Sequence, residues 1–288
     1  MKALDIATVG TASYNTLQAA IDAAASSGES ITLIRNAVSN DTVTIGGNVT
    51  IDKGEYSLTF NGSPAIKLDS GVSMPDAIAG LNAFDAMVNL SDGSTVYFNT
   101  FSQALKSYSK VTLARDVVTT GTITLSGSRT IDFNSYDLTS SADEAFQFLG
   151  AMTTGTATIS FINSADETSV ITGGINILCQ NYTFNFTLGE NVEVRDNSPL
   201  FLQGNGKAGC ITADIYGSLV MEAENGEDIY AAIQGNGQAK YAGTVVNIYE
   251  GAVVSNDRTA AIYHPQEGVL NVYGGTIEGR HRYLHQVR

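Results

Sequence analysis

The sequence is poor in several residue types, and each shortage narrows what the protein can be. It has no tryptophan, four prolines and two cysteines in 288 residues, and no apolar run long enough to span a bilayer, so we expect no membrane insertion. Basic residues are scarce too, with 15 Lys and Arg against 29 Asp and Glu and a formal net charge of −14. Such a chain repels phosphate, which excludes nucleic acid and anionic membranes as expected partners.

The residues after Met1 lack the apolar stretch of a signal peptide. Two explanations stay open: a signal removed upstream of this sequence, or a protein that leaves its cell by lysis, as a phage component would. What the chain has in abundance is Gly, Thr, Ser, Asn, Val and Ile. Because β-branched residues suit pleated strands and Gly and Asn suit turns, the composition predicts an all-β protein.

The first half of the chain contains a duplication. Residues 31–35 (ITLIR) reappear at 111–115 (VTLAR), and the motif at 42–52 reappears at 122–132 in the same register. A short helical pattern precedes each copy, with apolar residues at i, i+3, i+4 and i+7: Leu17, Ala20, Ile21, Ala24, and Phe101, Ala104, Leu105, Tyr108. Asn15, with Gln18 three residues on, predicts the start of the first helix.

The second half contains a shorter repeat. Four segments align, at residues 184–187, 213–216, 246–249 and 270–273, and a second column aligns residues 200–206 with 231–237. Alternation makes one face of the four segments apolar, so that face is expected to form the core. The other face should carry a column of Asp214, Asn247 and Asn271 beside a column of Tyr216, Tyr249 and Tyr273.

These repeats predict a right-handed parallel β-helix, that is, a solenoid with short capping or inserted α-helices. We expect a first helix-plus-strands unit at 1–80, a second copy at 81–160, regular coils at 161–279 and a basic tail at 280–288. Together they would form one continuous solenoid domain.

Several stretches resemble the β-helix repeat domains of secreted and surface proteins of gut Firmicutes, and similar coils in phage structural proteins. The resemblance lies in residues 14–24 followed by 30–33, in TIDFNSYDLT at 130–139, and in residues 260–268 with 272–279. It implies the architecture and says little about activity, because such coils occur in adhesins, tail proteins and polysaccharide-active enzymes alike.

No catalytic constellation stands out, so we favour a protein that is not an enzyme. Asp52 and Asp132 are equivalent positions of the duplication and fit turn residues. His264 lacks a second His or Cys nearby for a metal site, and is expected to be a turn histidine. Arg195-Asp196 and Asp257-Arg258 fit local ion pairs on the surface.

The tyrosine and Asn/Asp columns are the predicted binding site, formed by Tyr216, Tyr249, Tyr273, Asn247, Asn271 and Asp214. Flat aromatic faces beside amides suit glycans or a host surface protein. The alternative is a structural ladder of stacked rings and bonded amides. We expect no cofactor, with a Ca²⁺ ion on the aligned Asp and Asn residues left open, and Cys179 and Cys210 either as free core thiols or as a disulfide.

Three functions are therefore weighed. The first is a non-catalytic extracellular or cell-surface module of adhesin type that presents a recognition face, with carbohydrate as a candidate ligand. The second is a phage tail or other virion protein that binds a receptor, for which a homotrimer would be expected. The third is a polysaccharide lyase or glycosidase.

Overall fold

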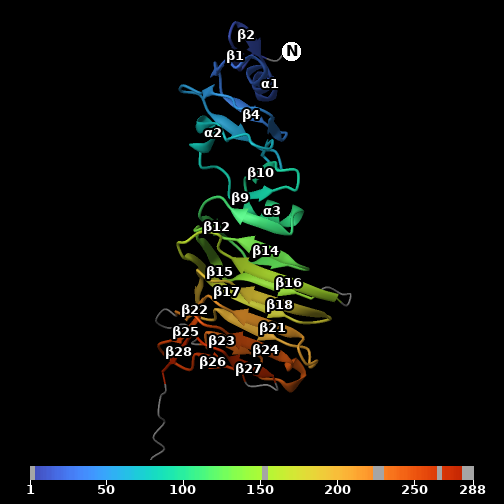
Figure 1. Cartoon of the computed structure of the whole chain (residues 1–288), viewed down its shortest axis with the longest axis vertical. Helices are drawn as coiled ribbons and strands as arrows, with labels where there is room; N and C mark the ends of the chain where they lie inside the picture. Colours follow the sequence, from blue (N-terminus) through green and yellow to red (C-terminus); the bar gives the residue numbers. More distant parts are fainter. Residues whose placement is uncertain (1–3, 151–154, 223–229, 265–267, 281–288) are drawn as a thin grey trace, which may run out of the picture. The chain divides into compact units, whose positions relative to one another are not determined.

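The computed structural model describes residues 4–150, 155–222, 230–264 and 268–280, and these are mostly β-structure (Figure 1). The chain forms two compact units, unit 1 at residues 1–115 and unit 2 at residues 116–288. No helix in the described part of the chain is both long and apolar enough to cross a membrane.

Unit 1 combines short strands with its helices. Its helices are α1 (Leu17–Ser27), α2 (Asp76–Ala79) and α3 (Phe101–Ser107). Its strands are β1 (Ala7–Val9), β2 (Ala12–Tyr14), β3 (Ile31–Leu33), β4 (Ala37–Ser39), β5 (Val43–Ile45), β6 (Ile51–Asp52), β7 (Leu58–Phe60), β8 (Ile66–Leu68), β9 (Ala86–Asn89), β10 (Thr95–Phe98) and β11 (Lys110–Leu113).

Unit 1 mixes parallel and antiparallel pairs. Strands β3–β6, β4–β7 and β5–β8 pair in parallel. By contrast, β1 pairs antiparallel with β2 and β3, and β10 pairs antiparallel with β8 and β9. Tight turns explain this: Gly10 (φ +55°) lies between β1 and β2, and Gly93 (φ +82°) lies between β9 and β10. Glycine adopts these left-handed conformations easily, so the chain reverses within a few residues.

Helix α1 buries the four residues that its sequence period predicts, Leu17, Ala20, Ile21 and Ala24. It begins one residue later than expected, because the side chain of Thr16 accepts the cap hydrogen bond from Ala19 N at 3.2 Å. The predicted cap of Asn15 with Gln18 was therefore wrong. The Gln18 amide instead bonds both the N–H and the carbonyl of Thr44 in β5, each at 2.8 Å, which ties the helix to the sheet.

Unit 2 contains longer strands. They are β12 (Val117–Thr119), β13 (Ile123–Leu125), β14 (Arg129–Asp132), β15 (Leu138–Leu149), β16 (Gly155–Ile162), β17 (Ser169–Leu178), β18 (Tyr182–Leu188), β19 (Val192–Asp196), β20 (Leu200–Gln203), β21 (Ile211–Ile215), β22 (Ser218–Met221), β23 (Ile233–Gly235), β24 (Thr244–Ile248), β25 (Val253–Asn256), β26 (Ile262–Tyr263), β27 (Val269–Val272) and β28 (Thr276–Gly279). A 3₁₀ turn, η1 (Ala239–Tyr241), precedes β24.

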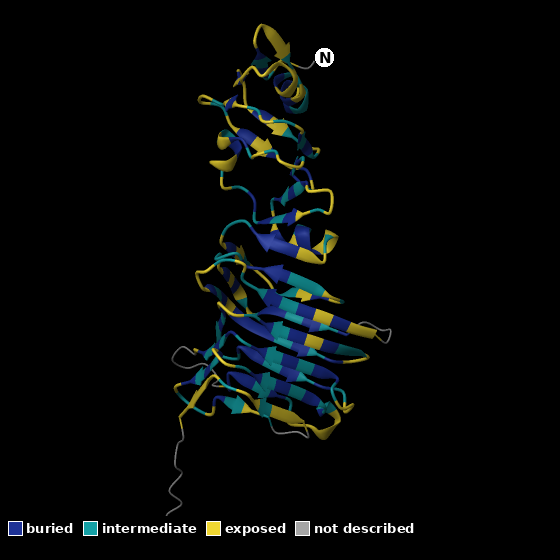
Figure 2. Cartoon of the chain, viewed as in Figure 1, coloured by how far each residue is buried: buried dark blue, intermediate teal, exposed yellow. Residues whose placement is uncertain are grey.

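The strands of unit 2 pair in parallel. One sheet runs in the order β14-β16-β18-β21-β24-β27. In the other sheet, the long strand β17 pairs through its first half with β19 and through its second half with β20. Two rows continue from there, β19-β22-β25-β28 and β20-β23-β26. Buried and partly exposed residues alternate along β21 and β24 (Figure 2).

The prediction of a right-handed parallel β-helix for the chain was wrong. The strands form four separate sheets, and unit 1 contains the antiparallel pairs of β1, β9 and β10. The physical reason is the chain reversal at Gly10 and Gly93. The two copies of the duplication nevertheless share the same local turn structure. Asp52 and Asp132 each accept a hydrogen bond from the backbone N–H two residues on, at 3.1 Å in both copies.

The register of the second-half repeat agrees with the sequence in part. Asp214, Asn247 and Asn271 lie opposite one another, as expected. The first segment is displaced by two residues, because Phe186 and not Phe184 lies opposite Ala213. Leu200 likewise lies opposite Ile233, two residues from the predicted partner. A shift of two keeps every side chain on its face, so the core assignment is unaffected. Of the predicted basic tail, residues 281–288 lie outside the described residues.

An aromatic cluster forms the centre of the core of unit 2. The Phe161 ring lies 4.8 Å from Phe146 and 5.4 Å from Phe133, between ring centroids, with edge-to-face angles of 62° and 67°. Phe186 lies 5.6 Å away on the neighbouring strand. All four side chains are fully buried. Edge-to-face packing of this kind stabilises a core beyond the area that it buries.

Candidate functional site

The three predicted tyrosines form a stack on the sheet of β21, β24 and β27. The ring centroids of Tyr216 and Tyr249 are 4.3 Å apart with planes 5° from parallel, and those of Tyr249 and Tyr273 are 5.2 Å apart at 25°. The three rings are therefore stacked face to face. Tyr273, which directly follows β27, is 66% exposed.

The amide column beside the rings is hydrogen-bonded along its length. Asn271 Nδ2 donates to Asn247 Oδ1 at 2.8 Å, and Asn247 Nδ2 donates to Asp214 Oδ1 at 2.7 Å. The structure thus brings all six predicted residues together, in the geometry of a ladder. Their role in binding a ligand stays a prediction, because the amides and the carboxylate are hydrogen-bonded to one another and the rings are stacked on one another.

We predict that Tyr249 ionises late. Desolvation in the stack, followed by the negative charge of Asp214, raises the pKa of Tyr249 to about 12 from an ordinary 10.0. The folded state then keeps a proton that the unfolded state releases, so the stability contributed by neutral Tyr249 is complete below pH 10 and is lost as the pH rises through about 12. Absorbance titration of phenolate should show a late component that Tyr249→Phe removes and Asp214→Asn shifts to lower pH. An unchanged titration curve in Tyr249→Phe would contradict this.

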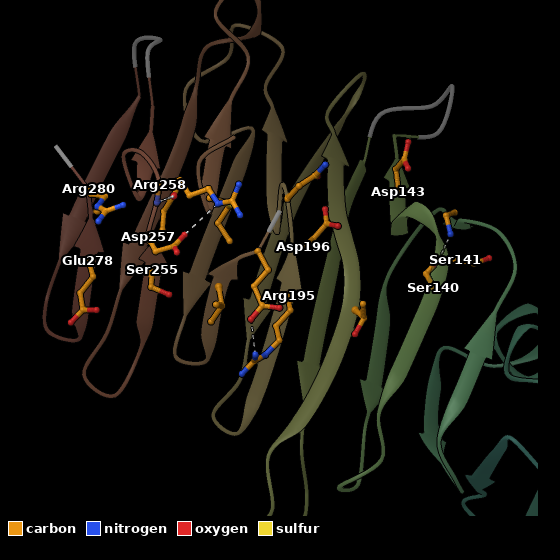
Figure 3. A pocket seen from close by; sticks show the side chains of 18 residues that line it. Ser140, Ser141, Asp143, Arg195, Asp196, Ser255, Asp257, Arg258, Glu278 and Arg280 are labelled. Carbon is orange, nitrogen blue, oxygen red and sulfur yellow. Dashed lines mark hydrogen bonds and ion pairs between the residues drawn. The ribbon is translucent and has the colours of Figure 1, made fainter. Parts of the chain in front are cut away.

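A groove lies on the other sheet of unit 2, and we call it the sheet groove (Figure 3). Its floor is one outward side chain from each of five paired strands, β17, β19, β22, β25 and β28: Thr172, Arg195, Val220, Ser255 and Glu278. Four strand spacings of about 4.8 Å give a floor about 19 Å long. Its volume is about 1100 Å³.

The lining of the sheet groove carries charges of both signs. Arg195 Nη1 bonds Glu222 Oε1 at 2.7 Å, and its Nε bonds Glu193. The Glu193 hydrogen bond, with the charge of both carboxylates, raises the pKa of Arg195. Arg258 lies 3.9 Å from an exposed Asp257, a weak surface pair. The predicted pairing of Arg195 with Asp196 was wrong, whereas that of Asp257 with Arg258 is confirmed.

The loop that carries Asp257 and Arg258 is fixed by a buried asparagine. Asn256 is 2% exposed, and its Oδ1 accepts hydrogen bonds from the backbone N–H groups of Arg258 and Thr259, each at 2.9 Å. Its Nδ2 donates to the carbonyls of Tyr230 at 2.8 Å and Ala260 at 3.0 Å. One side chain thus holds the rim of the groove in a defined conformation.

A second hollow adjoins the sheet groove and shares Asp143, Asp196 and Asn197 with it. We call it the aromatic hollow, because Phe201 and Tyr230 line it together with Gln234, in a volume of about 480 Å³. Asn176, Phe201 and Gln234 lie opposite one another on β17, β20 and β23, so they form one outward row. Rings and amides therefore meet beside the carboxylates of the groove.

The two cysteines are free and buried thiols; Cys179 directly follows β17 and Cys210 directly precedes β21. Cys210 Sγ lies 3.4 Å from the Gly243 carbonyl, and Cys179 Sγ lies 2.5 Å from the Tyr182 carbonyl. A hydrogen bond between the two thiols lowers the pKa of Cys210 and raises that of Cys179. Of the two states that the sequence left open, the structure has the free thiols.

Other candidates of the sequence have structural roles. Asp132 Oδ1 accepts bonds from its own turn and from Ser164 N at 3.0 Å. His264 Nε2 lies 2.6 Å from the buried Thr244 hydroxyl, and burial lowers its pKa. Within the described ranges, no group of three or more His, Cys, Asp or Glu residues is placed to hold a metal ion.

Sequence reasoning missed both hollows. The groove floor is Thr, Arg, Val, Ser and Glu in successive strands, so no residue type repeats and no column stands out. Phe201 lies in an aligned segment of the repeat, and its outward position could have been recognised from the alternation Leu-Phe-Leu-Gln.

No protein-family model, no curated protein and no solved structure matches this chain. The function is therefore inferred from the geometry of the site alone.

Proposed function

We propose that the protein is a non-catalytic recognition module that binds a carbohydrate chain in the sheet groove and the aromatic hollow. The observation that carries this is the combination of two rings, several amides and paired charges along one continuous open surface. Sugars present C–H faces to aromatic rings and hydroxyl rims to polar groups. Side-chain amides both donate and accept hydrogen bonds, and carboxylates accept them, so a sugar hydroxyl finds both kinds of partner here.

The size of the groove favours an extended oligomer over a single sugar. Five strands contribute to its floor, and the small side chains of Val220 and Ser255 leave its middle open. Because carbohydrate polymers occur mainly outside cells, we propose that the protein is located at a cell surface or in the extracellular medium, with a virion as the alternative. The charge of the sheet groove favours neutral or amino-substituted sugar chains over uronates, because acidic residues outnumber basic ones in its lining. The five acidic residues are Asp143, Asp196, Glu222, Asp257 and Glu278, and the three basic residues are Arg195, Arg258 and Arg280.

We predict that Phe201→Ala weakens carbohydrate binding by about tenfold, the loss of roughly 1.4 kcal/mol of ring contact. A glycan array with the whole chain would identify ligands, and isothermal titration would compare the variants. Tyr273→Ala is the matched control, because it removes one exposed ring from the tyrosine stack and leaves the groove intact.

Three results would contradict the proposal. Binding that falls in Tyr273→Ala and not in Phe201→Ala would move the site to the tyrosine stack. An array without ligands would remove carbohydrate as the ligand class. Release of shortened oligomers from a bound chain would show that the protein is an enzyme, with the carboxylates of the groove as the first candidates.

A further inference from the structure

The fold of unit 2 brings its two cysteines together from different sheets. Cys179 directly follows β17, which belongs to one sheet, and Cys210 directly precedes β21, which belongs to the other. Cys179 Sγ lies 3.5 Å from the carbonyl oxygen of Cys210 itself, and the two side chains are hydrogen-bonded to each other. The two positions are 31 residues apart in the chain, so the pairing of the strands makes them neighbours.

The sulfur of Cys210 has polar surroundings. It accepts a hydrogen bond from the backbone N–H of Asn205 at 3.4 Å, and the carbonyl oxygens of Gly243 and Ala242 lie 3.4 and 3.6 Å away. A cysteine that only fills space in a core behaves as a small apolar residue and needs no such partners.

The hydrogen bond between the thiols makes them chemically unequal. Cys179 donates and Cys210 accepts, which is the largest cause of the raised pKa of Cys179 and of the lowered pKa of Cys210. Because the thiolate and not the thiol is the nucleophile, Cys210 is the more reactive of the two.

Each thiol lies beside an exposed turn. Gln180 and Asn181, which follow Cys179, are exposed, and so are residues 206–208, which come shortly before Cys210. The cysteines themselves are only 3% exposed. A small oxidant can therefore reach them through a local opening of these turns, whereas a large one is kept out.

We propose that Cys179 and Cys210 form a redox pair, which a peroxide converts into a disulfide between the two sheets. The Cys210 thiolate attacks one oxygen of hydrogen peroxide, the O–O bond breaks, and Cys210 becomes a sulfenic acid. The hydroxide that leaves takes up the proton of the Cys210 thiol and becomes water. Cys179 then loses its proton and attacks the Cys210 sulfur, the S–O bond breaks, and a second water leaves. The two thiols lose two electrons, and the peroxide is reduced to two molecules of water.

The disulfide would stabilise unit 2, because it closes the segment between Cys179 and Cys210 and so restricts the unfolded chain. This inference goes beyond the proposed carbohydrate binding and does not depend on it. Neither cysteine lines the sheet groove or the aromatic hollow.

Mass spectrometry of the whole reduced chain after treatment with hydrogen peroxide tests the proposal. We expect the loss of two hydrogen atoms, a peptide in which Cys179 is joined to Cys210, and reversal by dithiothreitol. The melting temperature of the oxidised protein should exceed that of the reduced protein by roughly 5–10 °C. Glutathione added to the same reaction shows that the peroxide concentration is sufficient.

Two serine variants test the order of the steps. In Cys179→Ser, Cys210 should gain one oxygen atom and form a sulfenic acid that dimedone captures. In Cys210→Ser, Cys179 should remain a thiol under the same conditions. Serine is close to cysteine in size, and its hydroxyl can donate to the same carbonyl groups, so both variants should fold, which circular dichroism would check.

An unsubstituted chain that keeps both thiols while glutathione is oxidised would overturn the proposal. So would the addition of oxygen without a disulfide, or disulfides formed only between chains. Equal oxidation of the two serine variants would overturn the role of Cys210 as the attacking thiol. Carbohydrate binding by both variants should be unchanged, so the failure of either proposal can be recognised separately.

Discussion

Replacement of Phe161 by alanine is expected to lower the free energy of unfolding of unit 2 by about 3–5 kcal/mol. The side chain is fully buried and packs edge-to-face against Phe133, Phe146 and Phe186. Removing the ring loses both its burial and these contacts, and leaves a cavity, because the neighbouring strands are fixed by parallel pairing and cannot close it. Urea denaturation followed by circular dichroism would measure the change.

The control for Phe161→Ala is Val118→Ala, which truncates a side chain that is 75% exposed. Its effect should stay within about 0.5 kcal/mol. A loss below about 1 kcal/mol in Phe161→Ala would mean that the cluster is not a tightly packed core. Phe161→Leu should lie between the two, since it fills part of the volume.

Gly243→Ala is the second substitution with a large expected cost, about 2–5 kcal/mol. Gly243 has φ +96°, which an L side chain rarely adopts, and a Cβ there would overlap the backbone carbonyl of Lys207. The positive φ costs an alanine about 1–2 kcal/mol. Forcing the segments of Gly243 and Lys207 apart adds about 1–3 kcal/mol. The segment also accepts the hydrogen bond of Cys210 N at 3.1 Å, so the displacement would strain the end of β21.

Gly251→Ala separates the two causes. Gly251 has φ +88°, but a Cβ there would meet no atom within 4 Å. We expect the conformational cost alone, about 1–2 kcal/mol. Thermal melting of both variants beside the unsubstituted protein would show the difference, and equal melting temperatures would contradict the steric explanation for Gly243.

The sequence predicted local structure well where alternation or helical period was strong. The buried face of α1 follows from Leu17, Ala20, Ile21 and Ala24. The inward positions of β21, β24 and their neighbours follow from a period of two, which a displacement of two residues does not change. The row of Asp214, Asn247 and Asn271 was predictable for the same reason.

The chain-wide fold was not predictable from the repeat. A repeated strand pattern specifies which face is buried, but not whether the next strand returns parallel or antiparallel. The glycines at Gly10 and Gly93 decided that in unit 1, together with the Asp92 side chain, which accepts a hydrogen bond from Ser94 N at 2.9 Å. The two-residue displacements of register in unit 2 likewise depend on the loops between the strands, and the alignment of the repeats does not predict how these loops set the register.

By itself, the sequence determined the β-structure, the faces of the strands, the duplicated turns and the tyrosine and amide columns. These depend on residues close together in the chain or on a strict period. Only the tertiary structure decided the division into two units and the place of the groove. The floor of the groove joins Thr172 to Glu278 across five strands, whose residue types differ and whose neighbours are fixed by register. Such a surface has no signature along the chain, because its members become neighbours only through the pairing of the strands.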